Sequence, residues 1–211
     1  MADLLCRTER RLGLLPGFPD AVRDAQATFR AVLAAMSRPG RVVPLPVLPA
    51  CGPDLPAAAL AVLLCLCDLE TALWAGAYGE GGHAGREAAA YLAFHCGCPE
   101  ARTPGEAAYA LCDVKSLPER LAGLPLGTPE FPDRSATVVA TCEALGQGHG
   151  VRIGGPGVPG EAELRVAGAR PALWSHLRDL AHAFPRGLDC IFVDGRRVAC
   201  LPRSARILEI L

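Results

Sequence analysis

Helical and strand-like segments alternate along most of the chain, and this alternation restricts the possible folds more than any other feature. Helices are expected over about residues 20–37, 57–67, 86–96 and 171–183. Strands are expected over residues 41–45, 71–75, 107–111, 135–142, 151–153, 163–166, 188–193 and 198–201. Elements that alternate in this way pack as layers around a shared sheet. We therefore predict an α/β fold with three layers around a mixed sheet, in one compact unit.

The first two helices carry clear local signals. Asp20 can cap the free amides of a first turn, and Ser37-Arg38-Pro39-Gly40 ends that helix. The apolar residues between these ends recur at helical spacing and are Val22, Ala25, Phe29, Val32, Leu33 and Met36. The second helix, Ala57 to Cys67, is apolar on nearly all sides, which predicts that it is buried.

Two shorter motifs predict local structure later in the chain. Asp194-Gly195 stands between two apolar runs, which predicts a tight hairpin and an antiparallel pair as the last element. Ser116 and Glu119 have the spacing of a capping box, which predicts a short helix.

Composition indicates a globular protein that does not bind nucleic acid. Of the 211 residues 51% are hydrophobic and 20% are charged, with a net charge of -1, so no positive field attracts phosphate backbones. The longest apolar segment, Ala57 to Cys67, is shorter than the roughly 20 residues that cross a bilayer. The first residues lack the pattern of a secretory signal, so we expect a cytoplasmic location.

Residues Gly155 to Gly160 match the dinucleotide-binding pattern G-x-G-x-x-G, but their context does not suit that function. Pro156 and Pro159 remove amide donors, and a strand-like segment follows where the motif requires a helix. We therefore interpret the segment as a loop between strands. The single lysine, Lys115, does not stand in a Walker motif and looks like a solvated surface residue, not the lysine of a pyridoxal-phosphate enzyme.

Ten cysteines in a chain without an export signal favour reduced, packed thiols. Cys65-Leu66-Cys67 and His95-Cys96-Gly97-Cys98 leave a metal site as an alternative, although their spacing is unlike that of structural zinc sites. A thiol-based metal protein would contain stoichiometric zinc or iron. We expect no metal and no cofactor.

Four residues are candidates for binding a ligand or another subunit: His95, Arg186, Asp189 and Arg203. Arg186 and Asp189 precede a predicted strand and Arg203 follows its partner, so they can converge at strand ends, where open α/β sheets bind ligands. The alternative is that Asp189 pairs with a nearby arginine to fix the turn or a subunit contact. His95 is either a proton shuttle or phosphate ligand, or a residue that caps the last carbonyls of its helix.

Several segments together resemble the PhnH family of bacterial carbon-phosphorus lyase systems, over roughly Phe18 to Ile207. The segments that carry the resemblance are Asp24 to Gln26, Phe29-Arg30, Ala35 to Gly40, Leu73-Trp74, Phe94 to Pro99, Leu126 to Glu130, Gly155 to Val158, Phe184 to Asp189 and Leu201 to Ser204. The chain departs from the family pattern at Ser204-Ala205, at Asp68 to Ala72 and in its longer N-terminal arm.

The resemblance implies a fold similar to pyridoxal-phosphate-dependent transferases but without the cofactor or its lysine. It also implies a homodimer-forming subunit that associates with the other core subunits of a phosphonate-degrading complex. Together these subunits transfer the ribose triphosphate group of ATP to an alkylphosphonate and displace adenine. A phosphonate or nucleotide intermediate is a further ligand to expect.

Two hypotheses about function follow. In the first, residues 1–17 are an arm, residues 18–211 are one PhnH-like domain, and the chain assists catalysis through an interaction surface without chemistry of its own. In the second, the chain is a self-sufficient transferase or hydrolase for a phosphorylated small molecule. The second requires His95, Asp189 and Arg203 to lie within hydrogen-bond reach around one cleft.

Overall fold

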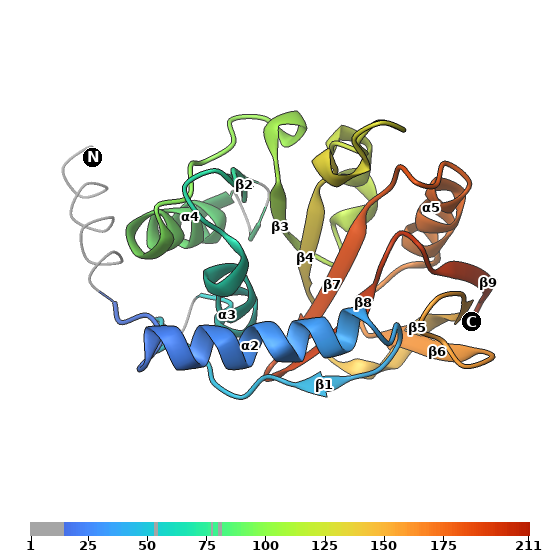
Figure 1. The fold of residues 1–211 in the computed structure, drawn as a ribbon, viewed down its shortest axis with the longest axis horizontal. Coiled ribbons are helices and arrows are strands. Elements are labelled where there is room, and N and C mark those ends of the chain that lie inside the picture. Colours follow the sequence, from blue (N-terminus) through green and yellow to red (C-terminus); the bar gives the residue numbers. More distant parts are fainter. Residues whose placement is uncertain (1–14, 53–54, 77, 80–81) are drawn as a thin grey trace.

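A six-stranded sheet forms the centre of the computed structural model, which describes residues 15–52, 55–76, 78–79 and 82–211 (Figure 1). Its strand order is β1-β8-β7-β4-β3-β2; β7, β4, β3 and β2 are parallel, and β8 is antiparallel to β7 and β1. The strands are β1 Val43–Pro44, β2 Leu73–Trp74, β3 Tyr109–Asp113, β4 Thr137–Thr141, β7 Asp189–Asp194 and β8 Arg197–Leu201. The prediction of an α/β fold with a mixed sheet is confirmed.

A second, three-stranded antiparallel sheet was not predicted as a separate unit. Its order is β6-β5-β9, with β5 Leu145–Gly154, β6 Ala162–Val166 and β9 Arg206–Ile210. The prediction that the β7–β8 hairpin is the last element is therefore wrong. Strand β9 follows it and pairs with β5, about fifty residues earlier in the chain.

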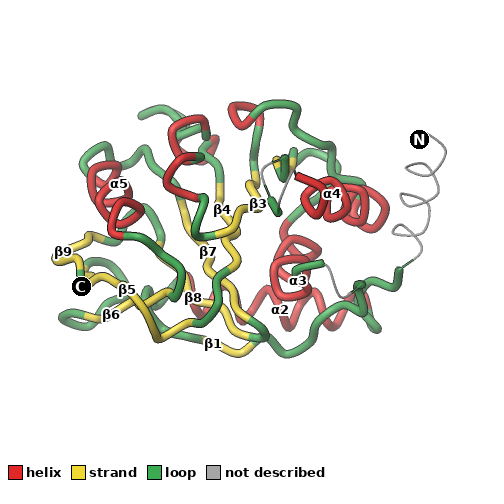
Figure 2. The backbone as a smooth tube through the Cα atoms, turned by 180° about the vertical axis from the view of Figure 1, so that it is seen from behind, coloured by secondary structure: helices red, strands yellow, loops and turns green. Residues whose placement is uncertain are grey.

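Helices α2 (Ala21–Met36), α3 (Ala57–Leu66) and α4 (His83–Cys96) cover one face of the large sheet. Helix α5 (Pro171–Ala181) and the small sheet cover the other face, and Figures 1 and 2 show the two layers from opposite sides. Side chains alternate along each strand, so Val138 and Val139 of β4 enter different hydrophobic cores. Within the described ranges, no helix combines the length and the apolar character needed to cross a bilayer.

Helix α2 is confirmed, but most of its larger apolar residues do not face the core. The Asp20 side chain caps it by accepting a hydrogen bond from the backbone N–H of Arg23 at 3.0 Å. Its buried residues are Thr28, Ala31, Val32 and Ala35, of which only Val32 belongs to the predicted apolar set. The small inward side chains let α2 pack closely on α3 and β8.

The predicted apolar helix at Ala57 is buried as expected, with Ala58 to Leu63 inaccessible or nearly so. Helix α4 begins at His83, three residues before the predicted start, and ends at Cys96. Gly97 caps it with a φ of +69°, which suits a residue without a side chain.

The shorter motifs had different outcomes. The hairpin is confirmed, since Asp194 pairs with Arg197 across a two-residue turn. The short helix after Ser116 is present as two 3-10 turns, Leu117–Glu119 and Leu121–Gly123, but the capping box is not formed, because Ser116 donates its hydroxyl to the Asp113 carbonyl. The glycine-rich segment joins β5 to β6, as predicted for a loop between strands.

Candidate functional site

The hairpin brings Asp189 and Arg203 together. Asp189 is the first residue of β7, and Arg203 lies two residues beyond the end of its antiparallel partner β8. The Asp189 carboxylate accepts hydrogen bonds from Arg203 Nε at 3.1 Å, from Arg203 Nη2 and from the Arg203 backbone N–H at 2.8 Å. The two side chains keep only 21% and 17% of their surface exposed, so each satisfies most of the other's polar groups.

Arg203 also ties the hairpin to a neighbouring loop, because its Nη1 donates to the carbonyl of Pro132. In the same region the Gly187 N–H donates to the Leu126 carbonyl at 3.0 Å. The ion pair therefore fixes the mouth of the hairpin against residues 126–132, which is the structural alternative that the sequence left open.

This pair lies at the amino ends of the parallel strands. Asp189 is level with Thr137, the first residue of β4. Open α/β sheets bind ligands at the carboxyl ends of their parallel strands. Asp189 and Arg203 lie at the opposite ends of these strands, so this rule does not support a ligand site at the pair.

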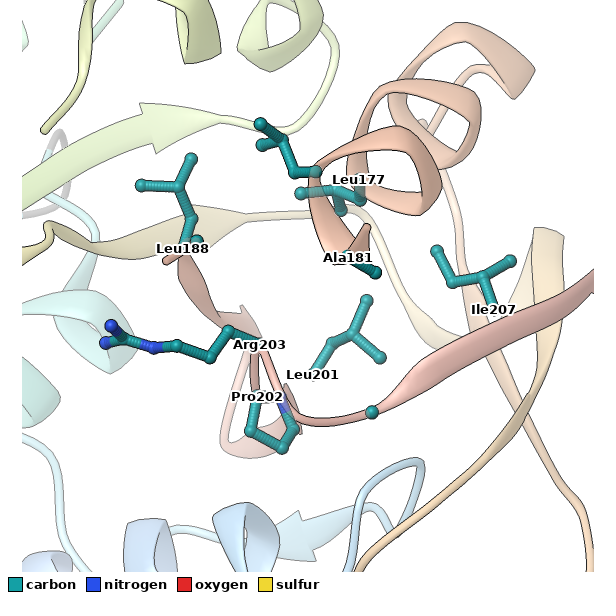
Figure 3. A pocket seen from close by; sticks show the side chains of 10 residues that line it. Leu177, Ala181, Leu188, Leu201, Pro202, Arg203 and Ile207 are labelled. Atoms are coloured by element: carbon teal, nitrogen blue, oxygen red, sulfur yellow. The ribbon is translucent and has the colours of Figure 1, made fainter. Parts of the chain in front are cut away.

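A small pocket beside the pair is almost entirely apolar (Figure 3). It is lined by Leu177, Leu180, Ala181, Gly187, Leu188, Leu201, Pro202, Arg203, Ala205 and Ile207. Figure 3 shows that the guanidinium of Arg203 points away from the side chains of Leu201, Ala181 and Ile207. The pocket can hold an apolar group but offers no general acid or base.

Arg186 lies in the turn before β7 with an exposed side chain. Its backbone N–H donates to the Ala183 carbonyl at 3.0 Å, and the turn contains a cis peptide bond between Phe184 and Pro185. Arg186 thus lies on the surface, in the turn that leads into Asp189 and its ion pair with Arg203.

His95 binds the start of the described chain. Its Nε2 donates to the Leu15 carbonyl at 2.9 Å, and the hydroxyl of Tyr91 donates to the Pro16 carbonyl at 2.9 Å. The ring of His95 also packs against Tyr91 and Phe94, with ring centroids 4.5 and 5.1 Å away. His95 therefore does not cap the last carbonyls of its own helix, as the sequence suggested, but holds the N-terminal segment on α4.

The structure does not bring His95 to the other candidates. The segment after His95 bridges to the outer side of β2 at Leu73, so β2, β3 and β4 stand between it and Asp189. In the ranges that the structure describes, no hydrogen bond or ion pair joins His95 to Asp189 or Arg203. The geometry that a self-sufficient enzyme needs from these residues is not formed.

A second pocket lies at the carboxyl ends of β4 and β7, and the sequence did not predict its residues. Its polar side chains come from Tyr78, Thr141, Cys142 and Asp194, and the start of α3 closes one side. Burial raises the pKa of the Tyr78 phenol, and Asp194 accepts a hydrogen bond from the Leu145 N–H at 2.6 Å. The sequence marks Asp194 only as a turn residue, and no local pattern marks Tyr78 or Thr141.

The nine cysteines in the described ranges are free thiols, as predicted. Three of them contact one another, because the Cys98 thiol is hydrogen-bonded to the thiols of Cys67 and Cys96. The hydrogen bond to Cys67, together with burial, raises the pKa of Cys98 to about 11. Among the described residues, no group of three His, Cys, Asp or Glu side chains is placed to hold a metal ion.

Comparison with known proteins identifies the family. Residues 16–208 match the family described as bacterial phosphonate metabolism protein (PhnH). The chain belongs to the PhnH family. The resemblance seen in the sequence is thereby confirmed over nearly the same residues.

Two relatives of this PhnH-family chain are named as subunits. It is 32% identical over 193 residues to alpha-D-ribose 1-methylphosphonate 5-triphosphate synthase subunit PhnH of Rhizobium meliloti (strain 1021), covering 90% of this chain and 93% of the relative. It is 36% identical over 182 residues to the putative C-P lyase subunit protein HtxG of Stutzerimonas stutzeri, covering 86% and 85%. Both relatives are thus named as subunits of larger enzymes.

Proposed function

We propose that this chain is a subunit of a bacterial carbon-phosphorus lyase complex for phosphonate catabolism. With partner subunits it is required to transfer the ribose triphosphate group of ATP to an alkylphosphonate, with adenine as the leaving group. The observation that carries the proposal is the match along almost the whole chain to a relative named as a subunit of ribose 1-methylphosphonate 5-triphosphate synthase.

We further propose that the subunit has no chemistry of its own. The Asp189 carboxylate and the Arg203 guanidinium are engaged with each other, and His95 is engaged with Leu15. The pocket beside Arg203 is apolar. These contacts support an assisting role in which Arg186, the Asp189–Arg203 pair and His95 shape interfaces.

The remaining features of the proposal come from the sequence and from the resemblance to the family. They are a cytoplasmic location, a homodimeric state, an arm over residues 1–17 before one domain over residues 18–211, and a fold like that of pyridoxal-phosphate-dependent transferases without the cofactor. The position of Lys115 supports the last feature, because its ammonium is largely exposed and pairs with Glu143 at 2.6 Å. A lysine that forms an aldimine is instead desolvated, whereas Lys115 lines a wide, open surface pocket together with Glu119 and Arg170.

The test is reconstitution with the remaining subunits of its own organism. ATP, methylphosphonate and the subunits are incubated with and without this chain, and release of adenine is followed together with formation of the ribose 1-phosphonate product. Loss of both when the chain is omitted is the expected result. Unchanged turnover without it, or turnover of a phosphorylated small molecule by the chain alone, would refute the proposal.

A further inference from the structure

The outward face of α2 carries a strip of large apolar side chains. Val22, Phe29 and Leu33 are 80%, 46% and 53% exposed. At 3.6 residues per turn the three side chains leave the helix within about 40° of one another. They lie on the side away from the buried alanines, with the exposed Gln26 between Val22 and Phe29, and Figure 1 shows this helix at the front of the molecule.

Arginines follow one side of this strip. Arg23 and Arg30 are both exposed and leave the helix about 80–100° from the centre of the strip. Arg23 has only a loose ion pair with Asp20, at 3.7 Å between largely exposed side chains. Within the part of the chain that the structure describes, Arg30 has no hydrogen bond or ion pair.

A second copy of this chain in an antiparallel arrangement does not suit this face. Two copies related by a twofold axis perpendicular to α2 would place their α2 helices antiparallel, with the arginine sides of both helices at the same edge of the contact. Arg30 of one copy would then approach Arg23 of the other, and like charges across an interface are unfavourable. A surface with an apolar strip edged by carboxylates complements both the strip and the arginines.

We propose that the outward face of α2, defined by Val22, Phe29, Leu33 and the flanking Arg23 and Arg30, docks another subunit of the phosphonate complex through an apolar strip edged by carboxylates. The inference rests on the proposed function, which supplies the partner subunits. Aromatic and arginine side chains, here Phe29, Arg23 and Arg30, are enriched at protein interfaces, where a few desolvated side chains carry most of the binding energy.

The experiment measures the affinity of the full chain for the assembled remaining subunits of its own organism. Leu33→Glu places a carboxylate in the strip, and Arg30→Glu reverses the charge beside it. Leu208→Glu is the matched control, because Leu208 is 48% exposed but lies on β9 of the small sheet. Circular dichroism and thermal unfolding establish that each variant is folded.

We expect Leu33→Glu and Arg30→Glu each to weaken binding at least about tenfold. Leu208→Glu should stay within about twofold of the unmodified chain, since it lies outside the docking face. The charge contribution should also appear in the salt dependence, which should be flatter for Arg30→Glu.

Other outcomes distinguish a failure of the docking proposal from a failure of the proposed function. If the unmodified chain binds the other subunits and both α2 variants bind equally well, the docking face is wrong while the proposed function stands. If Leu33→Glu instead converts a dimer of the isolated chain to a monomer in light scattering, the face is a self-contact and the docking proposal fails. An unmodified chain that binds no other subunit would overturn the proposed function and the docking proposal together.

Discussion

Replacement of Asp189 by Leu tests whether the buried ion pair is a structural clamp. The change leaves the Arg203 guanidinium without its carboxylate and the Arg203 N–H without its acceptor. Breaking one partner of a buried pair costs about 3–5 kcal/mol. Because about a fifth of each side chain remains in contact with water, we expect the lower end, about 3 kcal/mol.

Thermal and urea unfolding measure this loss. For a chain of this size each kcal/mol corresponds to about 2–4 °C, so the midpoint should fall by about 6–12 °C. A second variant, Asp189→Leu with Arg203→Met, removes both charges and should recover to within about 1 kcal/mol of the unmodified protein.

Two results would refute this reasoning. If Asp189→Leu unfolds within about 1 kcal/mol of the unmodified protein, the pair does not fix the hairpin mouth. If methylphosphonate raises the unfolding midpoint of the unmodified protein but not that of the double variant, Arg203 and Asp189 bind ligand instead of only each other.

Three further predictions concern other parts of the molecule. Gly157→Ala should cost about 3 kcal/mol in urea unfolding, because its Cβ would lie 2.2 Å from the Ser37 carbonyl oxygen, whereas Gly160→Ala, at a similar φ in open space, should cost about 1 kcal/mol. His95→Ala should speed amide hydrogen exchange across residues 15–17 in mass spectrometry, because it removes the donor to Leu15; unchanged exchange would mean that His95 is not the tether. The free energy of unfolding should fall from pH 9 to 11, since unfolded thiols ionise near pH 9 while the pKa of Cys98 is raised to about 11, and the fall should be smaller in Cys98→Ala.

Elements with local signals could be predicted from the sequence. Examples are the Asp20 cap, the apolar run of α3 and the two-residue turn after Asp194. Each of these depends only on residues that are close together in the sequence. Strand β9 lacks such a signal, because its partner β5 is distant in sequence and only Ile207 of its residues is buried. Its pairing is a property of the assembled fold.

The orientation of α2 could not be predicted for a different reason. Periodicity locates large apolar residues, but alanines and Thr28 fill the inward side, where β8 and α3 approach closely. Large apolar residues on the opposite side, Phe29 and Leu33, therefore dominate the pattern without being buried.

The candidate site was predicted in part. The meeting of Asp189 and Arg203 follows from the hairpin, which joins the two positions whatever the rest of the fold. Their place at the amino ends of the parallel strands depends on strand direction and order, which the sequence alone does not specify. The polar residues at the opposite edge, Tyr78 and Thr141, lie 63 residues apart and meet only through that order.

The edge strands of the large sheet have a consequence for behaviour at high concentration. Both β1 and β2 contain only two residues, and Pro44 of β1 has no N–H to donate. Edges this short offer few backbone groups to a strand from another molecule, so the large sheet resists growth by edge-to-edge pairing. Aggregation by added strands should therefore begin at the five-residue edges of the small sheet, Ala162–Val166 and Arg206–Ile210.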